Sequence, residues 1–390
     1  MSEQTRFAPM EYRRFGKTEL KLSVITLGGM RYPSSGADPQ TTETLPDEAL
    51  EACYQCTQRA LDLGINHIET AHGYGLSERL YGATWRRLRQ RRDEFYLMTK
   101  GAPATWDDAM RQVEVQLGRL QTDRIDLYGW HGINTPEINQ SATAKGGPVE
   151  ALHRLREEGV IGHVGFSTHG PVGVILDAIN TGLFEFVNLH CYYFFQRNLP
   201  AVIQAGLRDM GVFIISPNDK GGQLFNAPDR LRGICAPLTP IQFNARFCLS
   251  HPQIHTLSFG IDKPEFFDEA MGVLNGGYYL SPADRRTKLE LDRQIERLGD
   301  TYCTGCYACL PCPEEINIPE VLRFRNMWKG YDMEAFGRYR YNMLQQKGHW
   351  FPGSFASACN DCGDCLPRCP VRLNIPELLR ETHAGLATTN

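Results

Sequence analysis

The stretch INHIETAHGYGLSERLYGATWRRL, residues 65–88, contains one expected strand followed by one expected helix. His67–Thr70 is a short β-prone run, and residues 77–91 have a helical pattern that begins at Ser77, a typical helix-start residue. The same order recurs along the first three hundred residues. The expected strands are Val24–Leu27, His67–Thr70, Phe95–Thr99, Ile125–Trp130, His163–Ser167, Phe184–His190, Val212–Ser216 and Thr256–Phe259. The expected helices cover residues 48–64, 77–91, 106–120, 148–158, 171–180, 199–209, 239–250 and 264–274.

Eight such βα units in about 250 residues predict an α/β fold, a (β/α)8 TIM barrel. A doubly wound open sheet is the alternative, because alternation of strands and helices does not by itself require closure. No G-x-G-x-x-G motif follows the first expected strand, which disfavours an open dinucleotide-binding sheet. Longer loops are expected at residues 31–46, 132–147 and 218–236.

Four titratable side chains follow the expected strands at their carboxyl ends, where TIM barrels place their chemistry. Glu69 ends the second strand, Tyr74 follows it, Lys100 follows the third and His131 the fourth. A tyrosine is a weak acid, and a neighbouring ammonium group lowers its pKa. Each residue alone fits a rim ion pair or a packed ring, but the four together indicate proton-transfer machinery.

The composition limits the classes of function. The chain has 390 residues, 42% of them apolar and 22% charged, as in an average globular protein. The net charge of −4 gives no field that would gather nucleic acid or an anionic membrane. The N-terminal residues lack the apolar core of a secretory signal, and no apolar run is long enough to span a bilayer. We therefore expect a cytoplasmic protein.

The unusual count is 13 cysteines, of which eight fall in the last ninety residues. Cys303, Cys306, Cys309 and Cys312 precede Pro313, and Cys359, Cys362, Cys365 and Cys369 precede Pro370. The second run has the ferredoxin spacing for a [4Fe–4S] cluster, and the first differs by one residue at its last gap. The fourth cysteine of such a run ligates the other cluster. The expected ligand sets are therefore Cys303, Cys306, Cys309 and Cys369, and Cys359, Cys362, Cys365 and Cys312. The alternatives are two four-cysteine zinc sites and, in a chain without a secretory signal, disulfides.

The C-terminal segment also repeats internally. CPEEINIPEVLR, from Cys312, recurs 57 residues later as CPVRLNIPELLR, from Cys369. Pro319 and Pro376 each indicate the first turn of a helix. We expect a barrel over residues 1–295 and, over 296–390, a small α-helical ferredoxin-like domain with two [4Fe–4S] clusters.

Several stretches resemble the aldo/keto reductase family, and the likeness covers roughly residues 11–275. They are YRRFGKTELKLSVITLGGM, INHIETAHGYGLSE, MTK, DLYGWH and GHVGFSTHG. The clustered cysteines resemble the subgroup with a C-terminal two-[4Fe–4S] ferredoxin-type domain. The resemblance implies a catalytic tetrad of Glu69, Tyr74, Lys100 and His131, with Glu69 where the family usually has Asp. Tyr74 would be the general acid, Lys100 would lower its pKa, Glu69 would hold Lys100, and His131 would orient the carbonyl.

The resemblance also implies NADPH, with NADH as the alternative, bound across the carboxyl rim of the barrel. The residues at the matching positions are Gly29, Met30, Ser167, Thr168, Asn188, Ser216, Gly260, Lys263 and Glu269. Thr168 stands where the family usually has Asn, and Ile215 where a Tyr commonly stacks on the nicotinamide.

Three functions compete. The first is an oxidoreductase that moves hydride between NAD(P)H and a carbonyl or alcohol, with two [4Fe–4S] clusters for electron transfer. The second is a single-electron enzyme linked to ferredoxin, in which the barrel binds substrate and nicotinamide is secondary. The third is a non-catalytic iron–sulfur redox sensor. The expected partners are a small-molecule carbonyl or alcohol substrate and a ferredoxin-type electron carrier, with no nucleic acid and no membrane.

Overall fold

The computed structural model describes the chain except residues 1–6, 34–36, 221, 276, 278 and 389–390. It divides into two compact units. The first comprises Met1–Asp219 and Asn244–Tyr279, and the second Lys220–Phe243 and Leu280–Asn390. The domain boundary between residues 295 and 296 stays a prediction; by compactness, residues 280–295 group with the C-terminal segment.

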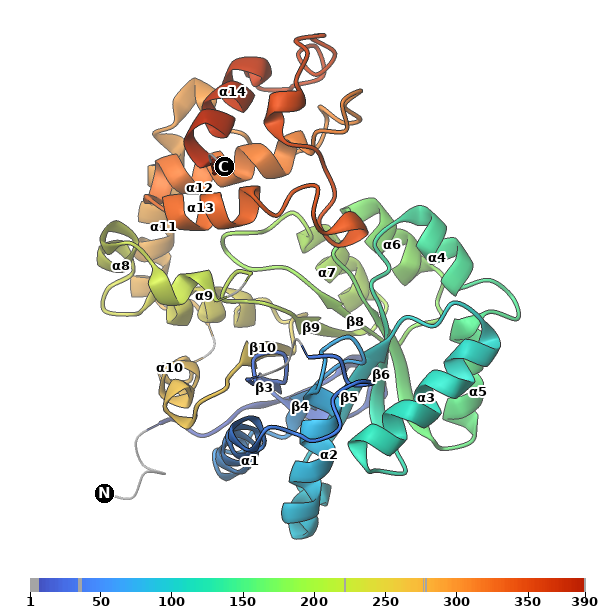
Figure 1. Ribbon diagram of the computed structural model, residues 1–390. Helices are drawn as coiled ribbons and strands as arrows, with labels where there is room; N and C mark the ends of the chain where they lie inside the picture. Colours follow the sequence, from blue (N-terminus) through green and yellow to red (C-terminus); the bar gives the residue numbers. More distant parts are fainter. Residues whose placement is uncertain (1–6, 34–36, 221, 276, 278, 389–390) are drawn as a thin grey trace. The chain divides into compact units, whose positions relative to one another are not determined.

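The first unit is built around eight parallel strands that close into a barrel (Figure 1). They are β3 (Ile25–Gly28), β4 (His67–Glu69), β5 (Tyr96–Gly101), β6 (Ile125–His131), β7 (Ile161–Ser167), β8 (Phe186–Leu189), β9 (Gly211–Ile214) and β10 (Thr256–Gly260). Each of the eight expected strands is present. Leu257 of β10 pairs with Ile25 of β3, and this pairing closes the sheet. The TIM barrel is confirmed, and the open-sheet alternative is wrong.

A short antiparallel hairpin precedes the barrel: β1 (Tyr12–Arg14) pairs with β2 (Lys21–Ser23). Phe15 and Leu22 of this segment are fully buried and form one apolar cluster with Met98, Phe186 and Phe213 of the barrel strands. The hairpin therefore contributes to the same core as the strands.

Helices follow the strands around the barrel. They are α1 (Asp47–Asp62), α2 (Ser77–Arg87), α3 (Trp106–Leu120), α4 (Pro136–Ala142), α5 (Pro148–Glu157), α6 (Val172–Asn180), α7 (Leu199–Leu207), α9 (Pro240–Leu249) and α10 (Phe267–Gly272). The expected helix 77–91 is too long, because α2 ends at Arg87 and a 3-10 segment follows it. The expected loop 132–147 contains α4, whose start is capped by the hydroxyl of Thr135.

The second unit is helical. Its helices are α8 (Asp229–Cys235), α11 (Pro282–Glu296), α12 (Ile318–Tyr331), α13 (Glu334–Tyr341) and α14 (Ile375–Leu386). Helix α8 lies inside the expected loop 218–236. Pro319 and Pro376 stand in the first turns of α12 and α14, as the internal repeat predicts. Among the described residues, no helix has both the length and the apolar character that crossing a bilayer requires.

Candidate functional site

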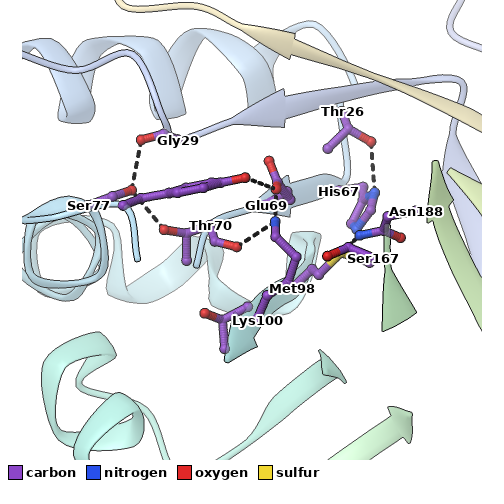
Figure 2. Close-up of polar contacts among 12 residues, drawn as sticks. Thr26, Gly29, His67, Glu69, Thr70, Ser77, Met98, Lys100, Ser167 and Asn188 are labelled. Atoms are coloured by element: carbon purple, nitrogen blue, oxygen red, sulfur yellow. Dashed lines mark hydrogen bonds and ion pairs between the residues drawn. The ribbon is translucent and has the colours of Figure 1, made fainter. Parts of the chain in front are cut away.

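Glu69 and Lys100 meet where β4 and β5 end (Figure 2), and Tyr74 contacts Glu69. Glu69 is the last residue of β4, and Lys100 lies near the end of the neighbouring β5. The Nζ atom of Lys100 contacts Oε1 of Glu69 and donates to the Thr70 carbonyl at 2.9 Å. Lys100 is 1% exposed and Glu69 3%, so the ion pair is shielded from water. A buried pair of this kind holds its geometry strongly, because each charge depends on the other.

Tyr74 joins the same pair. Its hydroxyl donates to Oε1 of Glu69 at 3.3 Å, and Nζ of Lys100 lies 4.8 Å from the centre of its ring. The His131 ring, at the end of β6, lies edge-on to Tyr74 with the ring centres 5.9 Å apart. The structure thus brings together all four residues of the predicted tetrad.

Burial sets the proton affinities of this group. It lowers the pKa of Lys100 well below its usual value, so the amine depends on the adjoining carboxylate for its charge. Burial raises the pKa of Tyr74, and the positive charge of Arg31 lowers it. Arg31 follows Gly28, Gly29 and Met30 after β3 and is exposed. Its side chain also passes Gly260, where an added Cβ would lie 2.7 Å from Cγ of Arg31.

Sequence reasoning did not identify Arg31. The only signal was a charged residue three positions beyond the end of the first barrel strand. Its position beside Gly260 depends on closure of the barrel between β10 and β3, which alternation of strands and helices alone does not require.

The residues expected at the nicotinamide lie at the ends of β7 and β8. Ser167 pairs in register with Asn188, and both are buried. The Asn188 amide donates to the Met98 sulfur at 3.3 Å, while its side-chain oxygen has no hydrogen-bond partner among the described residues (Figure 2). A buried polar atom without a partner is costly, so this oxygen is suited to a ligand donor such as a carboxamide N–H. The Thr168 hydroxyl instead binds neighbouring backbone groups: it donates to the Ile133 carbonyl and accepts from the Gly170 amide.

The remaining expected contacts follow β3, β9 and β10. The Gly29 amide donates to the Glu69 carbonyl at 2.8 Å, and the adjacent Met30 is 54% exposed. Ser216 has a left-handed backbone with a φ of 51°. Lys263 is exposed after β10, and Glu269 lies on α10. These positions share the carboxyl side of the barrel with the tetrad.

The eight cysteines of the two C-terminal runs form two groups. Cys312, Cys359, Cys362 and Cys365 line one pocket, with about 330 Å³ of empty space including open solvent. Burial, and then the charges of Cys359, Cys362 and Cys312, raise the pKa of Cys365. The pocket therefore combines three cysteines of the second run with the last cysteine of the first.

The other group combines three cysteines of the first run with the last cysteine of the second. Burial raises the pKa of Cys303 to about 11, and the charges of Cys306 and Cys369 add to the rise. Burial also raises the pKa of Cys309, and the charges of Cys303, Cys306 and, from the other group, Cys365 add to the rise. The crossed ligand sets themselves stay a prediction from the spacing.

A zinc site and an iron–sulfur cube place their four thiolate ligands differently. Four thiolates on one zinc would lie roughly 4 Å apart, given a Zn–S distance of ~2.3 Å and tetrahedral geometry. Within the part of the chain that the structure describes, no three His, Cys, Asp or Glu side chains are placed to hold one ion. An iron–sulfur cube spreads its thiolate ligands over four irons and suits a wider arrangement.

The other five cysteines are buried. Cys53 and Cys56 are fully buried on α1, and burial raises the pKa of both thiols. Cys191, Cys235 and Cys248 are equally inaccessible. Such thiols are unreactive packing residues.

Comparison with known proteins agrees with this geometry. Residues 24–217 match the aldo/keto reductase family model, and residues 302–374 match the 4Fe-4S dicluster domain. Residues 24–217 are an aldo/keto reductase domain. The chain is thus an aldo/keto reductase-like oxidoreductase with a 4Fe-4S dicluster domain.

The similar proteins cover between 55% and 72% of this chain. The uncharacterized oxidoreductase YqkF of Bacillus subtilis is 27% identical over 305 residues, which cover 68% of this chain and 92% of YqkF. The uncharacterized oxidoreductase YrpG of the same organism is 27% identical over 243 residues, 55% of this chain and 68% of YrpG. The holo form of aldo-keto reductase AKR11C1 from Bacillus halodurans shares the fold, with a TM-score of 0.58 and 23% identity over 72% of this chain and 96% of that structure.

Proposed function

We propose that the barrel transfers hydride between a nicotinamide dinucleotide and a small carbonyl or alcohol substrate, and that two [4Fe–4S] clusters transfer electrons. The observation that carries the proposal is the buried Lys100–Glu69 pair in contact with Tyr74 beside His131. When bound, the nicotinamide supplies or accepts the hydride, and each cluster carries one electron at a time.

Each tetrad residue has a distinct task in this proposal. Tyr74 gives its hydroxyl proton to the carbonyl oxygen of the substrate, which becomes the alcohol oxygen. Lys100 places positive charge beside the Tyr74 ring and favours loss of that proton. Glu69 keeps Lys100 charged in its buried position. His131 donates to the same carbonyl oxygen and orients it.

The cofactor contacts follow from where the polar groups lie. Asn188 and Ser167 would hold the carboxamide of the nicotinamide, with Thr168 in the loop beside them. Gly29, Met30 and Ser216 would also contact the dinucleotide. Gly260, Lys263 and Glu269 would meet its adenosine end, where the charge of Lys263 would favour NADPH over NADH.

The cluster ligands are the two crossed sets of cysteines. Cys303, Cys306, Cys309 and Cys369 hold one cluster, and Cys312, Cys359, Cys362 and Cys365 hold the other. Cys306 and Cys362 are exposed, which gives each cluster an outward-facing ligand for exchange with a ferredoxin-type carrier. Clusters on free thiolates require a reducing compartment, so we place the protein in the cytoplasm.

A second candidate is the single-electron enzyme in which nicotinamide is secondary. Ile215 favours it, because this side chain packs against the core cluster at the position where the resemblance implies a stacking aromatic ring. Binding of NADPH and NADH to the purified protein, followed by fluorescence, separates the two. No binding of either nucleotide contradicts hydride transfer.

The catalytic role is tested by Tyr74→Phe in the holoprotein. Loss of NADPH-dependent aldehyde reduction, with cofactor affinity retained, is expected. Tyr54→Phe is the matched control, since Tyr54 lies on α1 under the guanidinium of Arg87 and should not affect turnover. Unchanged turnover in Tyr74→Phe would remove this residue from the mechanism.

A further inference from the structure

The two cysteine loops of the second unit are structural copies of each other. Each has left-handed residues on both sides of its second cysteine: Gly305 and Tyr307 around Cys306, and Asp361 and Gly363 around Cys362. Equivalent cysteines also have equal burial, with Cys309 7% and Cys365 8% exposed. Residues at matching positions of the two loops can therefore be compared directly.

The clearest difference is Tyr307, which matches Gly363 of the second loop. Its φ is 64°, a backbone conformation that a bulky residue rarely adopts, whereas Gly363 takes 79° without steric conflict. The Tyr307 hydroxyl donates to Oε1 of Glu320 at 3.0 Å. This bond ties the tyrosine to the start of α12.

Glu320 itself departs from the repeat. It is 4% exposed, and Nε of Arg323 donates to its second oxygen at 3.3 Å. The matching Glu377 is exposed and accepts from the Asn374 amide at 2.6 Å. The helix that follows the first loop, α12, thus carries a buried carboxylate in its first turn, whereas the helix that follows the second loop, α14, carries an exposed one.

The same contrast holds for the matching arginines. Arg323 is directed to buried Glu320, but Arg380 pairs with Asp361 at 2.6 Å on the exposed side of the second loop. In that pair the carboxylate is 59% exposed, so water screens its charge. Glu320 is not screened in this way.

The Tyr307–Glu320 hydrogen bond ties this carboxylate to the first cysteine loop. Tyr307 directly follows Cys306 in the chain, and the carboxylate that accepts from its hydroxyl is buried. A buried negative charge near a cluster disfavours an added electron, because water does not screen the repulsion between like charges there.

We propose that Tyr307 and Glu320 are positioning residues that make the cluster of Cys303, Cys306, Cys309 and Cys369 the harder of the two to reduce. The inference rests on the proposed ligand sets. Reduction adds one electron to a cluster, from the 2+ to the 1+ state, and makes or breaks no bond. The first electron then resides on the cluster of Cys312, Cys359, Cys362 and Cys365.

The test is a redox titration of the full-length holoprotein, with dithionite as the reductant and the electron paramagnetic resonance signal of the reduced clusters as the readout. The wild type is expected to show two waves. Glu320→Gln and Tyr307→Gly are each expected to raise the midpoint potential of the lower wave and to leave that of the upper wave unchanged. The expected size is about tenfold in the electron-sharing equilibrium, or ~59 mV for a one-electron couple.

Two features keep the test decisive. Tyr307→Gly installs the residue of the second loop, so it relieves rather than adds backbone conflict, and Glu377→Gln is the matched charge control that should move neither wave. Iron counting distinguishes failure of this inference from failure of the proposed cluster ligation. If the wild type holds about eight irons per chain and yet shows two coincident waves, or a lower wave that neither variant moves, this inference alone is overturned. Well below eight irons in the wild type overturns the proposed ligation as well.

Discussion

The hydroxyl of Tyr74 donates a 3.3 Å hydrogen bond to Oε1 of Glu69, the same oxygen that contacts Nζ of Lys100. One carboxylate oxygen therefore serves both the ammonium group and the phenol. A glutamate at this position is one carbon longer than the aspartate that the family usually has. The proton that Tyr74 would give to a substrate is held by Glu69 until the hydroxyl turns away.

Shortening this side chain should release Tyr74. Glu69→Asp withdraws the carboxylate by about 1.5 Å, the length of one C–C bond. We expect kcat for aldehyde reduction to rise by up to about tenfold, since a hydrogen bond to a charged group contributes ~1.5 kcal/mol or more. Steady-state kinetics with one aldehyde and saturating NADPH measure the change.

The control for this variant is Glu78→Asp. Glu78 is also fully buried, but its carboxylate accepts from Thr99, Gln116 and Arg119 and from no side chain of the tetrad. It should lower stability without raising kcat. A fall in kcat for Glu69→Asp would show that the longer side chain supports the reaction.

The pH profile should depend on Arg31. Tyr74 acts as an acid only while protonated, so reduction is lost as the pH rises through its pKa. The charge of Arg31 lowers that pKa, so Arg31→Met should raise it and move the alkaline limb of kcat/KM to higher pH. Arg31→Lys keeps the charge and should leave the limb near its original place.

Arg111→Met serves as the comparison variant, because Arg111 is an exposed α3 residue paired with Asp108. It removes one positive charge from the chain and should not shift the limb. A shift to lower pH in Arg31→Met would contradict the assigned direction.

The sequence predicts the barrel well because its strands are short β-prone runs separated by amphipathic helices. It predicts the tetrad because the carboxyl ends of successive parallel strands meet at one rim. It does not predict α11, whose sequence PADRRTKLELDRQIE is dominated by charged residues; the start of this helix depends on a capping box between Ser281 and Asp284.

The contacts that the sequence does not reveal join segments distant in the chain. Arg31 comes close to Gly260 only after the barrel closes, and Tyr307 contacts Glu320 only after the cysteine loop folds back onto α12. The spacing of the cysteines, in contrast, predicts by itself which thiolates lie together. For this reason the crossed grouping of Cys312 with Cys359, Cys362 and Cys365 can be expected from the sequence.

Cofactor affinity should depend on the oxygen of Asn188. Asn188→Ala removes a buried acceptor on β8 that has no hydrogen-bond partner among the described residues. We expect the Kd for NADPH to rise about tenfold, or ~1.4 kcal/mol, as measured by fluorescence titration. Asn139→Ala on α4 is the control, since its side-chain oxygen also lacks a partner but lies outside the proposed cofactor contacts. Equal effects of the two variants would argue against a carboxamide contact at Asn188.

The crossed ligation of the clusters can be tested by pairing cysteine substitutions. In the crossed arrangement Cys306 and Cys369 belong to one cluster, so the double variant Cys306→Ser/Cys369→Ser loses that cluster alone. About four irons per chain should remain, because the pocket of Cys312, Cys359, Cys362 and Cys365 keeps all its ligands.

The complementary double variant is Cys306→Ser/Cys312→Ser. Its two substitutions lie in the same run of sequence but, by the crossed assignment, in different clusters, so both clusters lose a ligand and the iron content should fall well below four. If each run instead held its own cluster, the two results would be exchanged. The two proteins carry the same number of substitutions of the same chemical kind. A difference in iron content between them therefore reports which thiolates share a cluster, rather than a general loss of stability.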